Sequence, residues 1–127
     1  GICTGALIER NICWSNGALG GAALNLDGVQ DSIVRNNLLF GNQATGLVMY
    51  RGDGGGGPRE MFVANNTIDQ PSNGRWCISI GQAEGAITLR NNILHTRHAT
   101  RGSLEFKAAA DVLVTDSDHN VLSKVTP

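Results

Sequence analysis

Basic side chains gather in one short stretch of the sequence. They are His95, Arg97, His98 and Arg101. Arg75-Trp76 lies upstream of them. Arginine can bind a carboxylate through two hydrogen bonds, and an indole ring can stack on a sugar ring. These residue types indicate a binding site for an acidic sugar. The alternative is an ordinary solvated loop in which Trp76 packs on the protein surface.

Charged residues also flank a glycine-rich segment, residues 52–58. Arg51-Gly52-Asp53 stands at its start, and Arg59-Glu60 follows it. Arg51 comes directly after a predicted strand and should project from a rigid position, so Arg51 and Asp53 join the candidate substrate-binding set. The alternative is a flexible insertion with solvated charges. An Arg-Gly-Asp triplet arises too often by chance to indicate adhesion.

A third group is Asp116, Asp118 and His119. Oxygen ligands so closely spaced suit Ca²⁺, but that ion needs about six to eight of them and a full calcium loop is absent from the sequence. We therefore predict a polar turn, with no metal site and no cofactor. Zinc-ligand spacings, nucleotide-binding loops and serine-hydrolase motifs are also missing from the sequence.

What would position these side chains is an internal repeat. Apolar residues surround an asparagine in Leu7-Ile8-Glu9-Arg10-Asn11-Ile12, Ile33-Val34-Arg35-Asn36-Asn37-Leu38, Phe62-Val63-Ala64-Asn65-Asn66-Thr67 and Thr88-Leu89-Arg90-Asn91-Asn92-Ile93, with a degraded copy around Asn120. The equivalent asparagines, Asn11, Asn37, Asn66, Asn92 and Asn120, lie 26, 29, 26 and 28 residues apart. A repeat of this length indicates a solenoid.

A second motif follows each asparagine at a nearly constant distance. It reads Leu24-Asn25-Leu26, Val48-Met49-Tyr50, Ile78-Ser79-Ile80 and Leu104-Glu105-Phe106. The apolar residues two apart are typical of a strand with one buried face. Each unit then holds at least two short strands separated by corners. One unit cannot bury its own apolar face, whereas stacked units form a continuous core.

The recurring asparagine has a physical reason. Asparagine tolerates positive φ at a sharp corner better than most residues do. Stacked amides about 4.8 Å apart can also bond along the column. We predict that structural ladder rather than ligand contacts, with Asn36, Asn65 and Asn91 forming a second, partly exposed column.

The alignment also assigns the two faces of the strands. We expect two inward columns: Ile8, Val34, Val63 and Leu89, and then Cys13, Leu39, Ile68, Leu94 and Leu122. Glu9, Arg35, Ala64 and Arg90 should lie outside, where charge is solvated. The predicted fold is all-β, a right-handed parallel β-helix of four to five coils, because parallel crossovers are almost always right-handed.

Three of these segments carry a resemblance to a known family. Arg35-Asn36-Asn37-Leu38-Leu39, Val63-Ala64-Asn65-Asn66-Thr67-Ile68 and Leu89-Arg90-Asn91-Asn92-Ile93-Leu94 resemble repeats of the pectate-lyase-like, right-handed β-helix superfamily. The resemblance covers residues 6 to about 109. It implies a fold, but the superfamily includes lyases, hydrolases, epimerases, phage tailspikes and non-catalytic surface proteins. The paired aspartates of its hydrolases and the Asp-Pro-His-Glu tetrad of its epimerases are missing, so the catalytic residues stay unassigned.

The bulk composition narrows the function. The 127 residues include 10 basic and 11 acidic side chains, whereas a dedicated nucleic-acid binder carries a basic excess. No apolar run approaches the roughly 18 residues that span a bilayer, so no membrane contact is expected. Cys3, Cys13 and Cys77 are odd in number and lack metal-ligand spacing, which predicts no disulfide framework.

Both ends of a solenoid leave strand edges unpaired. Residues 108–115 should start another strand, which Asp116-Ser117-Asp118-His119 interrupts, and Pro127 has no N–H for a further ladder. We therefore expect residues 1–127 to form a single domain that is a piece of a longer solenoid, or one whose open end is covered by another chain. Because these edges are unpaired, we also predict homo-oligomers that form through the open ends.

Two classes of function fit the sequence. The first is a carbohydrate-associated β-helix module that binds or processes an acidic polysaccharide as a lyase or hydrolase relative, which would suit an extracellular location. The second is a non-catalytic structural protein that self-assembles. The sequence leaves open whether the protein is an enzyme.

Overall fold

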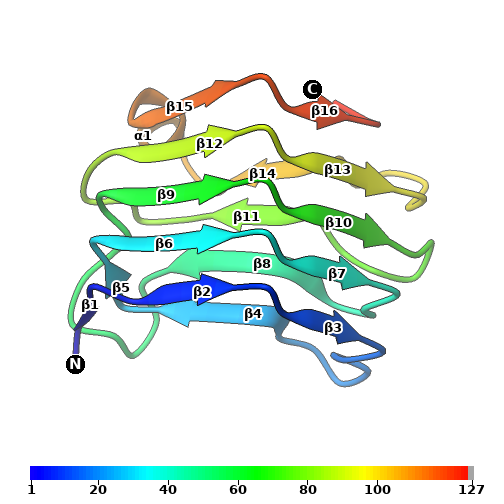
Figure 1. Cartoon of the computed structure of the whole chain (residues 1–127), viewed down its shortest axis with the longest axis horizontal. Helices are drawn as coiled ribbons and strands as arrows, with labels where there is room; N and C mark the ends of the chain where they lie inside the picture. The colour runs from blue at the N-terminus through cyan, green and yellow to red at the C-terminus, as the bar shows by residue number, and fades with distance from the viewer. Residues whose placement is uncertain (126–127) are drawn as a thin grey trace.

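The computed structural model describes residues 1–125, which stack as successive coils around one axis (Figure 1). The first sheet contains β2 (Leu7–Glu9), β6 (Ser32–Arg35), β9 (Met61–Ala64), β12 (Ile87–Arg90) and β15 (Thr115–Asp118). The second contains β3 (Ile12–Trp14), β7 (Leu38–Phe40), β10 (Thr67–Gln70), β13 (Ile93–Thr96) and β16 (Val121–Leu122). The third contains β4 (Ala22–Asp27), β8 (Thr45–Tyr50), β11 (Ile78–Ile80) and β14 (Leu104–Phe106). β1 (Cys3–Thr4) pairs separately with β5 (Val29–Gln30).

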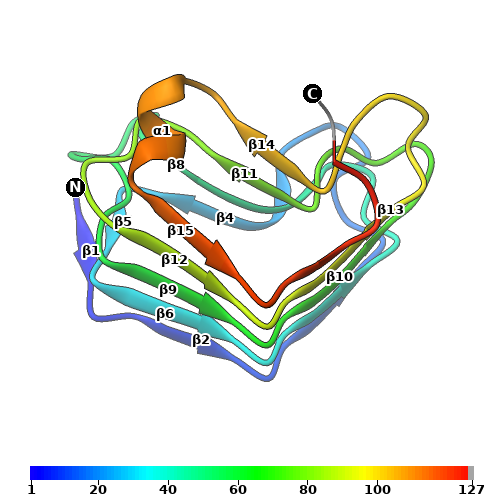
Figure 2. The same ribbon diagram turned by 90° about the horizontal axis from the view of Figure 1, so that it is seen from above.

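The strands in each sheet pair in parallel, each with the equivalent strand of the next coil. Figure 2 looks down on the C-terminal coil, and the chain runs anticlockwise as it rises toward the viewer. That sense is right-handed. The prediction of an all-β, right-handed parallel β-helix is therefore confirmed.

The core lies between the sheets and combines the predicted inward columns with buried residues of the third sheet, among them Met49, Ile78 and Ile80. Val34, Val63 and Leu89 of the first sheet are almost completely buried, as are Leu39, Ile68 and Leu94 of the second. Ile8, Cys13 and Leu122, in the first and last coils, pack against this core but are only partly buried. The repeat identified in the sequence thus corresponds to one coil.

The asparagine ladder is also present. The Oδ1 atom of Asn37 accepts hydrogen bonds from the backbone N and the Nδ2 of Asn11, at 3.1 and 3.0 Å. Asn66, Asn92 and Asn120 repeat this arrangement with the asparagine of the preceding coil. Each Nδ2 after the first also donates to a backbone carbonyl of the preceding coil. The ladder therefore joins neighbouring coils at the corner between the first and second sheets.

The expectation that the ladder asparagine itself has positive φ is wrong. The left-handed residue is the one before it: Arg10, Asn36, Asn65, Asn91 and His119 have φ between 54° and 58°. This residue turns the backbone outward and leaves the side-chain amide of the following asparagine pointing into the coil. Asn36, Asn65 and Asn91 form the expected exposed column.

The predicted outer column lies on the outer face of the first sheet, as expected. Its charged side chains, however, form ion pairs and are not simply solvated. Arg35 lies 2.7 Å from Glu9, and Arg90 bonds Asp116. The hydrogen bond from Arg35 lowers the pKa of Glu9, more than burial raises it. Ala64 is buried, since its neighbours in register are the two longer arginines.

In the third sheet, the register of β8 differs by one residue from the register predicted by the sequence alignment. Leu47-Val48-Met49, rather than Val48-Met49-Tyr50, is in register with Ile78-Ser79-Ile80. Because side chains alternate between faces, this slip turns Val48 and Tyr50 outward and Leu47 and Met49 into the core. Tyr50 is thereby moved from the expected core to the surface.

The C-terminal part also differs from expectation. Residues 108–115 were expected to form a strand, but they contain α1 (Ala109–Leu113), and the strand β15 follows it. Alanine favours helix, and the buried Asp111 carboxylate accepts hydrogen bonds from the backbone N of Ala108 and Ala83, at 2.9 and 2.8 Å. β15 pairs with β12 through its backbone, without an apolar alternation. Pro127 lies outside the described residues.

Candidate functional site

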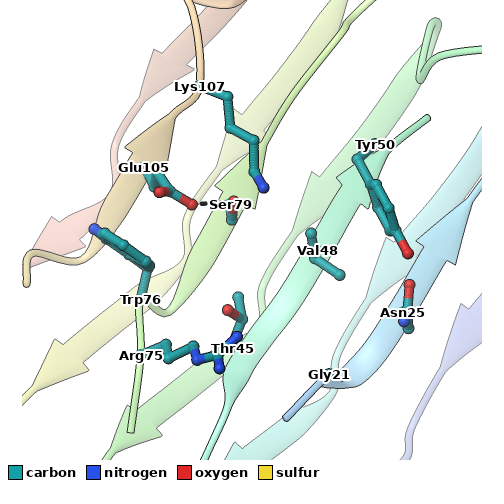
Figure 3. Close-up of a pocket in the computed structure, with 10 residues that line it drawn as sticks. All are labelled: Gly21, Asn25, Thr45, Val48, Tyr50, Arg75, Trp76, Ser79, Glu105 and Lys107. Carbon is teal, nitrogen blue, oxygen red and sulfur yellow. Dashed lines mark hydrogen bonds between the residues drawn. The ribbon is translucent and has the colours of Figure 1, made fainter. Parts of the chain in front are cut away.

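A shallow groove of about 190 Å³ lies on the outer face of the third sheet (Figure 3). Arg75 and Trp76 border it where the strands begin, and Tyr50 and Lys107 border it where they end. Between these rows lies a floor of outward side chains in one register column: Asn25, Val48, Ser79 and Glu105. Because this column crosses the strands, the groove follows the axis of the solenoid.

The electrostatics of the groove are mixed. Glu105 accepts a hydrogen bond from the Ser79 hydroxyl. Lys107 extends over Gly81, where a Cβ atom would lie only 2.8 Å from the lysine Cδ. Among the lining residues in the part of the chain described, Glu105 is the one carboxylate, facing the cations Arg75 and Lys107. The groove is thus polar, with a net positive lining and two aromatic rings.

Arg101 supports the Trp76 ring from the next coil. Its guanidinium carbon lies 4.8 Å from the ring centroid, and its Nη1 donates to the Gly74 carbonyl at 3.3 Å. Such a cation–π contact contributes about 0.5–1 kcal/mol at an exposed site. Arg101 thereby restricts the indole on the border of the groove.

His98 shapes the turn that carries Arg101. Its Nδ1 accepts hydrogen bonds from the backbone N of Thr100 and Arg101, at 3.1 and 3.0 Å. Lys124 donates to the backbone carbonyls of His98 and Ala99. His98 therefore acts on the groove indirectly, through the position of Arg101.

His95 and Arg97 lie elsewhere, on the outer face of the second sheet. Both contact Asp69, with His95 Nδ1 at 2.7 Å and Arg97 Nη2 at 2.6 Å. Partial burial raises the pKa of Asp69, but the hydrogen bonds from His95 and Arg97 outweigh this and lower it overall. The predicted basic cluster is thus divided: Arg75, Trp76 and Arg101 meet at the groove, whereas His95 and Arg97 form an ion-pair cluster on another face.

The glycine-rich segment is held to the body of the solenoid by ion pairs and by hydrogen bonds to its backbone. Arg51 lies 3.4 Å from Glu84, and Arg59 lies 3.7 Å from Asp31. Asp27 accepts hydrogen bonds from the backbone N of Gly52, Asp53 and Gly54, at 2.7, 2.8 and 3.0 Å. Arg51 and Asp53 are exposed beside the groove but do not line it.

Acidification should release this segment. The hydrogen bond from Gly52, followed by those from Asp53 and Gly54, lowers the pKa of Asp27 below its usual 3.8 despite some desolvation. A depressed pKa means that the anchor is intact above about pH 3.8 and is lost as the pH falls through the folded-state value. The amide NMR shifts of residues 52–54 should therefore titrate together, with a midpoint below 3.8.

The Asp27→Asn variant supplies the control for that titration, because it lacks the titrating group and its amide shifts should show no common transition. A shared midpoint at or above 3.8 in the unmodified protein would contradict the anchoring role of Asp27.

In the acidic group near the C-terminus, both aspartates contact nitrogen atoms of other side chains. Asp116 bonds Arg90, which lowers the pKa of Asp116, and Asp118 lies 2.9 Å from His119. Residues 1–125 contain no cluster of three or more His, Cys, Asp or Glu side chains that could hold a metal ion.

Two further findings concern groups outside the groove. Burial raises the pKa of the Cys77 thiol to about 12, which makes it a poor nucleophile. No helix among the described residues is long and apolar enough to cross a membrane.

The sequence indicated Arg75, Trp76 and Arg101 but missed Tyr50, Glu105 and Lys107. Tyr50 was missed because of the one-residue slip in β8. Glu105 could have been found, since it is the polar middle residue of a recognised strand triplet. Lys107 directly follows the same triplet, at the next outward position.

Comparison of the chain with models of protein families, with curated proteins and with solved structures gave no match in any of the three. The fold and the groove define the class of the protein: a parallel β-solenoid with a polar groove, bordered by aromatic residues, on its third sheet.

Proposed function

We propose that the groove on the third sheet binds an acidic polysaccharide, and that the chain is a relative of the pectate-lyase-like β-helix proteins. The observation that carries the proposal is the pairing of two aromatic rings, Trp76 and Tyr50, with two cations, Arg75 and Lys107, around one groove. Aromatic faces suit the apolar faces of sugar rings. Arginine and lysine suit carboxylate groups.

The shape of the groove favours a long ligand over a small one. Its volume of about 190 Å³ is below the roughly 300–1,000 Å³ of pockets that enclose small molecules. It extends from Asn25 in β4 to Glu105 in β14, across every strand of the third sheet. Strands in a sheet lie about 4.8 Å apart, close to the length of one sugar unit, so a glycan chain along the axis would place one unit on each coil.

The groove supports binding better than hydrolysis. Glycoside hydrolysis requires two carboxyl groups about 5 to 9.5 Å apart. The nearest outward carboxylate on the sheet from a different coil is Asp27, which is three strands from Glu105, or about 14 Å at the usual strand spacing. Asp27 is also occupied by the backbone of residues 52–54.

Binding to polygalacturonate, alginate and chondroitin sulfate, measured by isothermal titration calorimetry, tests the proposal. Arg75→Ala and Lys107→Ala should each weaken binding about tenfold or more, because a hydrogen bond to a charged group contributes about 1.5–3 kcal/mol. Arg97→Ala is the matched control. It removes an arginine of the same sequence cluster that the structure places on the second sheet, and it should change the affinity less than about twofold.

No binding to any of the three glycans would contradict the proposal and favour the structural role. One observation already fits that role: Ile12, Trp14, Leu38 and Phe40 form an exposed apolar patch on the second sheet. An oligomer that persists at nanomolar concentration would then be expected.

A further inference from the structure

The chain contains one N-x-Ser/Thr motif, which is the acceptor sequence for N-linked glycosylation. It is Asn65-Asn66-Thr67, and none of the other asparagines is followed two positions later by serine or threonine. The two asparagines of the motif are not equivalent in the structure. Asn66 is buried in the ladder, whereas Asn65 is exposed.

Asn65 is well presented for modification. It follows β9 with a φ of 55°, at the corner where the first and second sheets meet. Its backbone N donates to the Arg90 carbonyl, which fixes the main chain. Within residues 1–125 its side-chain amide makes no hydrogen bond that a modification would break, unlike the four made by the Asn66 side chain.

Thr67, the hydroxyl residue of the motif, has unusual neighbours. It begins β10 and is in register with Leu38 on one side and Ile93 on the other, both exposed. Phe62 is exposed on the adjoining face of the first sheet. A bulky hydrophilic group on Asn65 would lie beside these apolar side chains and reduce their contact with other molecules. Figure 2 shows this corner on the side of the solenoid opposite the third sheet, so the groove stays open.

We propose that Asn65 is an acceptor for an N-linked oligosaccharide. The donor class is a lipid-pyrophosphate-linked oligosaccharide. Asn65 Nδ2 forms a bond to C1 of the first sugar, the bond from C1 to the pyrophosphate oxygen breaks, the lipid pyrophosphate leaves, and the amide loses one proton. The result is a glycan projecting from the convex corner. This assignment does not depend on the function proposed for the groove.

Translation of the chain behind a cleavable signal peptide, in the presence of endoplasmic-reticulum microsomes, tests the proposal. The product should gain the mass of one oligosaccharide, and peptide-N-glycosidase should remove it, leaving aspartate at position 65. Asn65→Gly should abolish the gain while folding normally, because glycine readily adopts the positive φ. Thr67→Val should also abolish it, although Asn65 itself is unchanged.

Leu38→Thr provides a positive control, since it extends the motif to Asn36 at the equivalent corner one coil earlier and should add a second glycan. An unmodified product, or a glycan that persists in Asn65→Gly, would overturn the proposal. Modification of Asn36 in the Leu38→Thr chain without modification of Asn65 would overturn it as well.

Discussion

Replacing Asn66 with alanine is expected to lower the free energy of unfolding by about 4 kcal/mol. The substitution leaves the backbone N and the Nδ2 of Asn37 without their acceptor, and the Val34 carbonyl without its donor. Each buried polar group left unpaired costs about 1–3 kcal/mol. Because small domains are stable by only about 5–15 kcal/mol, the loss should be evident in urea unfolding followed by circular dichroism.

Two matched variants distinguish the contribution of the asparagine ladder to stability from that of the adjacent corner. Asn65→Gly changes the adjacent asparagine, whose side chain is exposed, and should alter stability by less than about 1 kcal/mol because glycine suits its positive φ. Asn11→Ala removes the first, exposed member of the ladder and should cost less than Asn66→Ala. Equal losses at positions 65 and 66 would show that the corner, and not the ladder, carries the stability.

Replacing Trp76 with alanine should weaken acidic-glycan binding about 10- to 100-fold. The indole provides the largest apolar surface of the groove, and burying a large apolar side chain contributes about 1.5–3 kcal/mol. Trp14→Ala is the control, because Trp14 lies on the second sheet and stacks on Phe40, with ring centroids 6.1 Å apart. It should leave the glycan affinity unchanged.

Arg101 extends the same prediction. Arg101→Ala should reduce the affinity less than Trp76→Ala does, and should increase acrylamide quenching of Trp76 fluorescence in a Trp14→Phe background. Arg101→Lys should restore both properties in part, since lysine retains the cation. Unchanged affinity in Trp76→Ala would show that the aromatic ring does not contribute to glycan binding.

The sequence predicted the coil because one physical requirement recurs in each repeat. Asn37, Asn66 and Asn92 satisfy backbone groups that face the interior at the same corner, and this demand keeps the asparagine while neighbouring residues vary. The positive φ was assigned to the wrong residue because Asn36, Asn65 and Asn91 are also asparagines. Only the first and last repeats, with Arg10 and His119 before the ladder asparagine, distinguish the two positions.

The departures from prediction come from tertiary context. In β8 the run Leu47-Val48-Met49-Tyr50 offers two apolar alternations, and only pairing with β11 decides between them. In residues 108–115 the same composition suits helix or strand, and contacts of Asp111 with Ala83 and Ala108 favour the helix. Tertiary context also explains why only part of the site was predicted. Arg75 and Trp76 could be recognised by residue type. The separation of Arg97 from Arg101 could not, because it depends on which sheet each residue lies beside.

If the outer face of the third sheet binds the glycan, as we propose, the ligand should perturb that face and leave the second sheet unchanged. The direct measurement is an NMR titration of the ¹⁵N-labelled chain with an oligogalacturonate. We expect progressive shifts at Tyr50, Trp76, Ser79, Glu105 and Lys107, with little change at Trp14, Phe40 or Arg97. Shifts confined to the second sheet, or no shifts at all, would contradict the claim.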